Sequence, residues 1–228
     1  MRQLSGSDNR DILDWVAQTI IHGTALVLPL FATFFGVQAL VPELLERFTS
    51  LVALRMSATR YLLARLLAAG SVSFALFFAY AAIDYFVLLW AFPAFDSKGA
   101  ALPPQSAFVD AYDFWAPLFH SSAEWFGVVY ASWFGLHAAV WAMLAFALVL
   151  LLKNLYIALV APVGIFLGLW LWFYEAQLYK LSPLSLWVVF VVPDMNFVVD
   201  TMVTLSALAL VIALALFAIF RRKSLGVD

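Results

Sequence analysis

Long apolar runs separated by shorter polar segments dominate the chain. Five runs have about the 20 residues that an α-helix needs to cross a bilayer. They occupy residues 19–40, 66–90, 124–152, 155–174 and 197–220. This pattern predicts an all-α polytopic membrane protein with about five transmembrane helices, built as a single transmembrane domain over residues 1–228.

Two shorter segments predict helices of another kind. Residues 11–18 mix apolar and polar positions, which favours an N-terminal interfacial helix. The run LSLWVVFVV, between Pro183 and Pro193, has nine residues. That is too few to cross a hydrocarbon core of about 30 Å as a helix. We therefore expect residues 176–196 to form a short re-entrant or interfacial helical segment before the last span.

Composition narrows the class of protein. The chain has 228 residues, of which 66% are hydrophobic, and it contains 22 Phe and nine Trp. A water-soluble domain of this size cannot bury so much apolar surface, so the composition indicates a membrane protein. The net charge is −2 and there is no long basic tract, so no nucleic-acid partner is expected. The absence of cysteine excludes disulfides and cysteine metal sites.

The basic residues favour one orientation. Placing residues 43–65, 153–154 and 221–228 on one side of the membrane collects eight of the twelve basic residues. These eight are Arg47, Arg55, Arg60, Arg65, Lys153, Arg221, Arg222 and Lys223. The positive-inside rule assigns that side to the cytoplasm. We therefore predict a multi-pass protein of the plasma (inner) membrane, with its N-terminus outside and its C-terminus inside.

The most distinctive stretch is PELLERFTSLVALRMSATRYLLAR, which ends at Arg65. Residues 43–65 hold two acids and four arginines, in a chain where only 11% of residues are charged. The middle of this stretch is amphipathic, so it is expected to lie along the membrane surface. A basic, amphipathic linker between two spans is typical of a cytoplasmic loop.

This stretch resembles the cytoplasmic loop of ABC-2-type transporter permeases. The resemblance rests on residues 46–49 (ERFT), a Leu-rich run, residues 57–60 (SATR), and Arg65. The family pattern is close to E-R/K-G-T, then L-x-x-x-P-x-S-R, then a basic residue five positions on. Here Phe48 replaces the family's glycine, and Met56 lies near its proline. The family usually has six spans and a cytoplasmic N-terminus, so the usual first span is missing here.

The resemblance implies the function of a permease subunit in an ABC transporter, exporting a hydrophobic or peptide-like substrate. The implied partners are ABC ATPase subunits, a second permease subunit, the same or different, and membrane lipid. ATP and Mg would bind the ATPase partner, with no cofactor on this chain and no enzymatic activity of its own. The implied coupling residues are Glu43, Glu46, Arg47, Arg55, Ser57 and Arg60. Ser57 is also expected to cap the helix that follows.

Two residues inside the predicted spans are candidates for a substrate pathway, Asp84 and His137. A plainer interpretation places Asp84 at the headgroup level and packs a lone histidine against a neighbouring helix. Gly127, Ala131, Gly135 and Ala139 recur every four residues, which favours close helix packing. Gly164-x-x-x-Gly168 predicts a further packing face.

Two other classes of function remain open. One is a non-transporting membrane protein, such as an immunity or sensor subunit. The other is a membrane subunit of an electron-transfer complex, in which His22, His120 and His137 would ligate haem or a metal. These histidines are scattered over different segments. The chain carries no Ser/His/Asp arrangement at a readable spacing and no phosphate-binding loop of the GxxxxGKS type.

Overall fold

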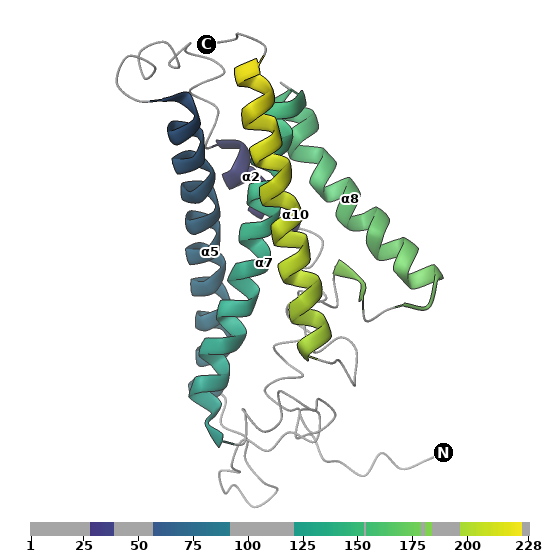
Figure 1. Ribbon diagram of the computed structural model, residues 1–228. Coiled ribbons are helices and arrows are strands. Elements are labelled where there is room, and N and C mark those ends of the chain that lie inside the picture. Colours follow the sequence, from purple (N-terminus) through teal and green to yellow (C-terminus); the bar gives the residue numbers. More distant parts are fainter. Residues whose placement is uncertain are drawn as a thin grey trace, which may run out of the picture.

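The computed structural model describes residues 28–38, 57–91, 121–152, 154–178, 181–183 and 197–224. These residues form five α-helices and no strand (Figure 1). In chain order the helices are α2 (Leu28–Gln38), α5 (Ala58–Ala91), α7 (Ala123–Leu152), α8 (Leu155–Glu175) and α10 (Phe197–Ser224). Successive long helices run in alternating directions, so that α5 and α8 are antiparallel to α7 and α10 (Figure 1).

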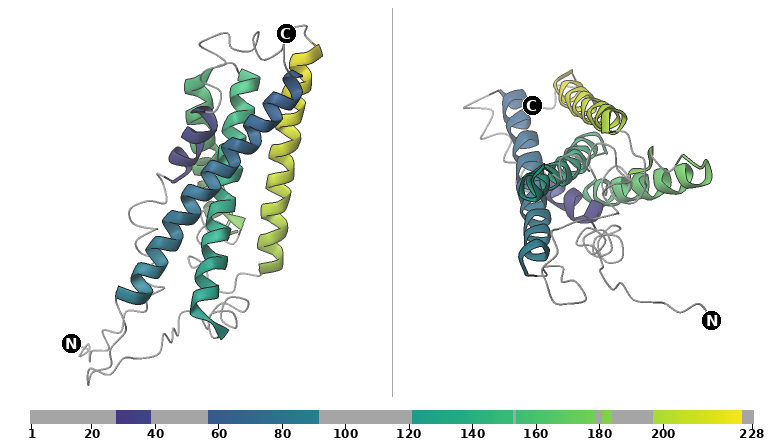
Figure 2. Two further views of the ribbon diagram at one scale, coloured as in Figure 1. Left: turned by 90° about the vertical axis from the view of Figure 1, so that its left-hand side faces the viewer. Right: turned by 90° about the horizontal axis from the view of Figure 1, so that it is seen from below.

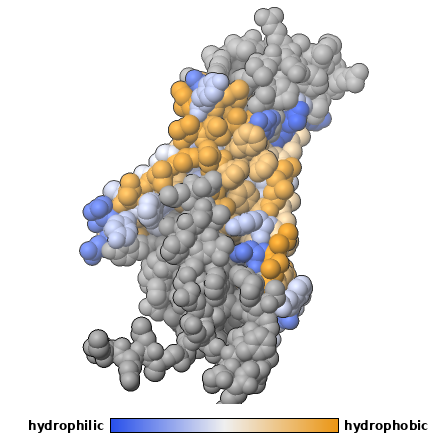
Figure 3. Space-filling view, turned by 180° about the vertical axis from the view of Figure 1, so that it is seen from behind, coloured by the Kyte–Doolittle hydropathy of each residue, from blue (hydrophilic) through white to orange (hydrophobic). Residues whose placement is uncertain are grey.

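Helix α7 lies at the centre of the bundle. It contacts α2, α5, α8 and α10, and it is the most buried of the long apolar helices. Figure 2 shows the same arrangement from below, with α7 between α5, α10 and α8. Most of the described surface seen from behind is hydrophobic (Figure 3). A buried central helix with apolar outer helices is the arrangement expected of a helical membrane protein.

Three of the helices are long and apolar enough to cross a membrane: α5, α7 and α8. The described part of α2 has 11 residues, and the apolar part of α10 covers Thr201–Phe217. The prediction of an all-helical membrane protein is therefore supported, with three spans of sufficient length among the described residues. The predicted N-terminal interfacial helix lies outside these residues, as does most of 176–196.

Helix α5 differs from its prediction at its start. The sequence pattern placed the span at 66–90 and left residues up to 65 in a loop, but the helix begins at Ala58. The physical reason is a helix cap combined with good helix formers. Ser57 accepts a hydrogen bond from the backbone N–H of Arg60, and residues 58–65 are mostly Ala, Leu and Arg. Its 34 residues give α5 a length of about 51 Å.

Small residues allow α5 and α7 to approach closely. A Cβ atom added to Gly135 would lie 2.8 Å from the carbonyl oxygen of Phe74, and one added to Gly127 would overlap the ring of Tyr85. Ser73 also donates a hydrogen bond of 3.2 Å to the carbonyl oxygen of Ala138. The predicted packing face on residues 127–139 is therefore confirmed. Gly36 makes an equally close approach, from α2 to the backbone of α7.

The other glycine pair behaves differently. A Cβ atom added to Gly164 or Gly168 would meet nothing within 4 Å. Both residues are exposed on α8, which is the least buried of the three long apolar helices. The predicted packing face on α8 is thus not used against the described part of this chain.

The bundle has a different core at each end. Where α7 starts, aromatic rings fill the space between α5 and α7, and the hydroxyl of Tyr85 donates to the carbonyl oxygen of Ala123 at 2.9 Å. Ring pairs there include Tyr85–Phe126, Phe126–Tyr130 and Tyr130–Phe134. Where α7 ends, the core is aliphatic and joins Leu62 and Leu66 of α5 to Ala215 of α10. This second core holds the start of α5 beside the end of α10.

Candidate functional site: the basic rim of the helix bundle

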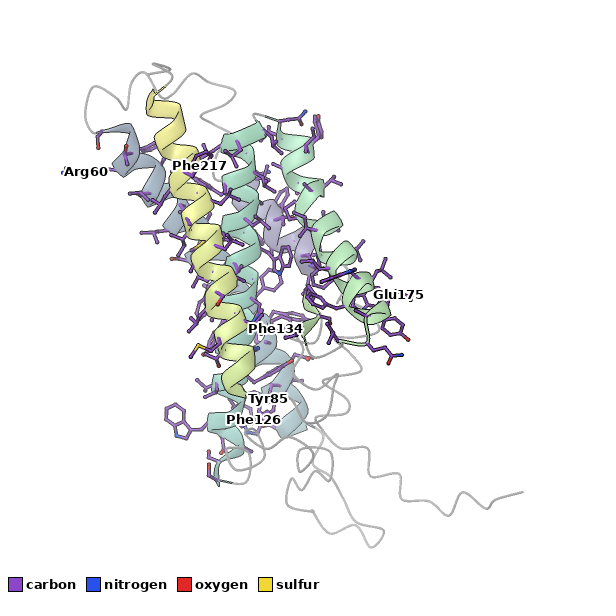
Figure 4. All side chains as sticks on the ribbon, turned by 45° about the vertical axis from the view of Figure 1, so that its right-hand side comes forward. Arg60, Tyr85, Phe126, Phe134, Glu175 and Phe217 are labelled. Atoms are coloured by element: carbon purple, nitrogen blue, oxygen red, sulfur yellow. The ribbon has the colours of Figure 1, made fainter. Side chains whose placement is uncertain are left out.

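Charged side chains on the described helices separate by sign. The basic ones lie at one end of the bundle, in the first turns of α5 and the last turn of α10. They are Arg60, Arg65, Arg221, Arg222 and Lys223, and we call them the basic rim. The acidic residues are in the parts of their helices that point away from this rim: Asp84, Glu124, Glu175 and Asp200. Figure 4 shows Arg60 and Glu175 at these opposite ends.

Arg60 lies in the first turn of α5 with its side chain exposed. Its backbone N–H is 3.4 Å from the hydroxyl oxygen of Ser57, and the carbonyl of Ser57 accepts from Tyr61 at 3.1 Å. Ser57 thus satisfies one of the N–H groups that a helix start leaves without a partner. The predicted capping role of Ser57 is confirmed, and the cap fixes the position from which Arg60 extends.

Arg65 is held by an aromatic neighbour one turn earlier. Its Nε–H donates a hydrogen bond of 3.0 Å to the hydroxyl of Tyr61. Its guanidinium carbon lies 5.3 Å from the centre of the Tyr61 ring, within the range of a cation–π interaction. The side chain is half-buried, so Tyr61 restricts the guanidinium to a small region beside α5.

The aliphatic core brings the two parts of the rim together. Leu62 and Leu66 of α5 share one cluster with Ala215 of α10, which is less than two turns before Arg221. Basic residues at the C-terminal end of α10 also interact favourably with the negative end of its helix dipole. No acidic residue lies in the described residues 57–65, 145–152, 154–160 or 212–224. The rim is therefore a region of uncompensated positive charge within the described part of the chain.

The structure describes two of the six predicted coupling residues, Ser57 and Arg60, and places them one turn apart at the rim. The other four, Glu43, Glu46, Arg47 and Arg55, lie outside the described residues. Sequence reasoning missed the pairing of Tyr61 with Arg65, although their i,i+4 spacing on a helix would have indicated it.

Asp84 lies on α5 towards the end opposite the rim. Its side chain is half-buried, and its Oδ2 atom is buried with no hydrogen-bond partner among the described residues. Tyr130 of α7 is close enough to interact electrostatically with it. An acid in such surroundings is a reasonable candidate for a substrate or ion pathway, and its role stays a prediction.

His137 links two helices. Its Nδ1 atom is 3.0 Å from the carbonyl oxygen of Trp133, and its Nε2 atom is 3.1 Å from the hydroxyl of Thr204 on α10. A carbonyl can only accept, so Nδ1 carries the proton and Nε2 accepts from Thr204 in the neutral ring. Both ring nitrogens are thus engaged inside the bundle. This geometry supports the plainer interpretation of His137 as a packing residue.

No protein-family model, curated protein or solved structure matches this chain. The functional argument therefore rests on the residues and geometry described above.

Proposed function

We propose that this chain is the transmembrane permease subunit of an ABC transporter and that its basic rim faces the cytoplasm. The observation that carries the proposal is the separation of charge. Five basic residues stand at the end of the bundle where the amphipathic segment 43–56 joins α5. The positive-inside rule favours the cytoplasm for that end. The motif that resembles the ABC-2 loop then lies on the side where an ATPase subunit works.

The five-span topology is part of the proposal. Helices α5, α7 and α8 supply three spans, and the segments that contain α2 and α10 supply the other two. The alternating helix directions agree with this arrangement, because antiparallel neighbours must cross in opposite senses (Figure 1). The N-terminus would then lie outside and the C-terminus inside the plasma (inner) membrane.

A coupling mechanism follows from the length of α5. The helix is continuous from Ala58 to Ala91, about 51 Å, and packs along α7. In this mechanism, ATP and Mg bind a separate ATPase subunit, whose closure pushes on residues 43–56. The rigid α5 would carry that displacement to the far end of the bundle, as in other hinge-and-shear transitions. Glu43, Glu46, Arg47, Arg55, Ser57 and Arg60 would form the contacts with the ATPase.

The proposed substrate is hydrophobic or peptide-like, because the described helices are largely apolar and place few charges between their ends. A second permease subunit, the same or different, would supply the span that the family usually has and this chain lacks. The alternative of a haem-bearing electron-transfer subunit would need histidine ligands, and His137 is already hydrogen-bonded through both nitrogens.

The topology predicts a clear labelling pattern. The natural chain has no cysteine, so each introduced cysteine is the only thiol. Cysteines replacing Ser97 or Ser106 should react with an impermeant thiol reagent on intact cells, whereas one replacing Ser224 should react only after the membrane is opened. Strong labelling of position 224 from outside would overturn the orientation.

The transporter function predicts a specific companion. The chain, purified in mild detergent from its native cells, should retain a subunit that hydrolyses Mg-ATP. This hydrolysis should be stimulated when a hydrophobic or peptide-like substrate is added. A preparation that hydrolyses no ATP, with the chain folded as shown by its helical circular dichroism, would refute the permease assignment. An immunity or sensor subunit would give that result.

A further inference from the structure

The basic rim has a second property that does not depend on an ATPase. Arg60, Ala64 and Leu67 of α5 are all exposed, and their i, i+4, i+7 spacing places them on one face of the helix. Leu62 and Leu66 are buried against α7, so the exposed face is the side of α5 turned away from the bundle. An arginine therefore stands directly above an apolar surface that faces outward.

The depth of Arg65 adds a constraint. This residue lies seven positions into α5, about 10 Å along its axis, in a stretch apolar enough to be part of a span. Its guanidinium is oriented by Tyr61 through the 3.0 Å hydrogen bond and the ring contact. A large acidic protein surface would have difficulty reaching a half-buried cation at that level. A phosphate that belongs to the membrane is already there.

The rim also carries more positive charge than one arginine pair. Arg221, Arg222 and Lys223 lie in the last turn of α10, beside the start of α5. Among the described residues at this end no carboxylate offsets them. Clusters of basic residues next to a membrane helix attract anionic lipids, and guanidinium groups match the oxygens of a phosphodiester.

From these observations we infer that the rim between α5 and α10 binds the headgroup of an anionic phospholipid. Arg60 and Arg65 bind the phosphate, the basic turn of α10 adds attraction, and the acyl chains lie along the outer face of α5. The partner is a lipid of the phosphatidylglycerol type, in preference to a zwitterionic one. This inference goes beyond the proposed transport function and holds whether or not an ATPase binds nearby.

The test uses the full chain in detergent, titrated with phosphatidylglycerol or phosphatidylcholine and followed by native mass spectrometry. The natural chain should retain phosphatidylglycerol at least tenfold more strongly. Each basic residue near a membrane surface contributes about fivefold to such binding. The double variant Arg60→Gln/Arg65→Gln should therefore lose about 25-fold in phosphatidylglycerol affinity. Its affinity for phosphatidylcholine should stay the same.

Three further samples make the result decisive. Glu175→Gln, at the opposite end, is the matched control and should keep the full preference. Arg65→Lys keeps the charge but loses the planar fork, so it should show a partial loss even if the double variant fails to fold. Inorganic phosphate should compete only weakly. Equal retention of the two lipids, an unchanged preference in both rim variants, or strong competition by free phosphate would each overturn the inference.

Discussion

Gly36→Ala should destabilise the protein, although the same change in an open helix position is stabilising. A Cβ atom added to Gly36 would overlap the backbone carbonyl of Ala142, so no flexible side chain can move aside. Helices α2 and α7 would have to separate. Overpacking of this kind costs about 1–3 kcal/mol, and it outweighs the roughly 0.5–1 kcal/mol that alanine gains over glycine in a helix. The midpoint of thermal unfolding in detergent should fall clearly.

Gly164→Ala is the matched control. It is also a glycine within an apolar helix, but a Cβ atom there meets nothing within 4 Å. We expect its unfolding midpoint to stay the same or to rise. Gly135→Ala should behave like Gly36→Ala, because its nearest neighbour is the carbonyl oxygen of Phe74. If Gly36→Ala and Gly164→Ala gave equal midpoints, the close approach of α2 to α7 would be wrong.

The contrast between these glycines shows what the sequence could predict. Spacing alone identified small residues at 127–139 and at 164–168 as equivalent packing motifs. Only the first set packs against the described part of the chain. In a soluble protein the polar face of a helix would separate the two cases. In α8 both faces are apolar, so the pattern carries no information about which face is inside.

Other features failed to appear in the sequence for physical reasons. Apolar run length located α7 and α8 well, since helix length in a membrane follows its thickness. It misplaced the start of α5, because hydropathy does not detect a capping serine or the helix propensity of Ala and Arg. The hydrogen bond from Thr204 to His137 joins residues 67 positions apart, and no local pattern predicts it.

The misplaced start of α5 changes the expected coupling mechanism. A flexible loop ending at residue 65 would absorb part of any displacement. A helix that begins at Ala58 places Arg60 on the same rigid element as the transmembrane part of α5. A push at Arg60 would therefore be transmitted with little loss.

In the proposed coupling, Glu46→Ala and Arg60→Ala should both weaken binding of the ATPase subunit or uncouple ATP hydrolysis from transport. At a partly desolvated interface, removing one member of a charged pair costs about 2–5 kcal/mol, much of it from the partner charge left behind. The same change in water costs only about 0–1 kcal/mol. Expression and membrane insertion should be almost unchanged. ATPase co-purification and substrate-stimulated hydrolysis measure the effect.

The choice of variants separates coupling from lipid binding. Arg60→Ala removes a positive charge and should affect both, whereas Glu46→Ala removes a negative charge and cannot act by losing an anionic lipid. A shared defect in ATPase binding therefore isolates the coupling contact. Asp96→Ala and Asp110→Ala, in the segment proposed to lie outside, serve as controls and should leave hydrolysis unchanged. If Glu46→Ala matches these controls, residues 43–56 do not couple to an ATPase, and the basic rim serves orientation and lipid binding alone.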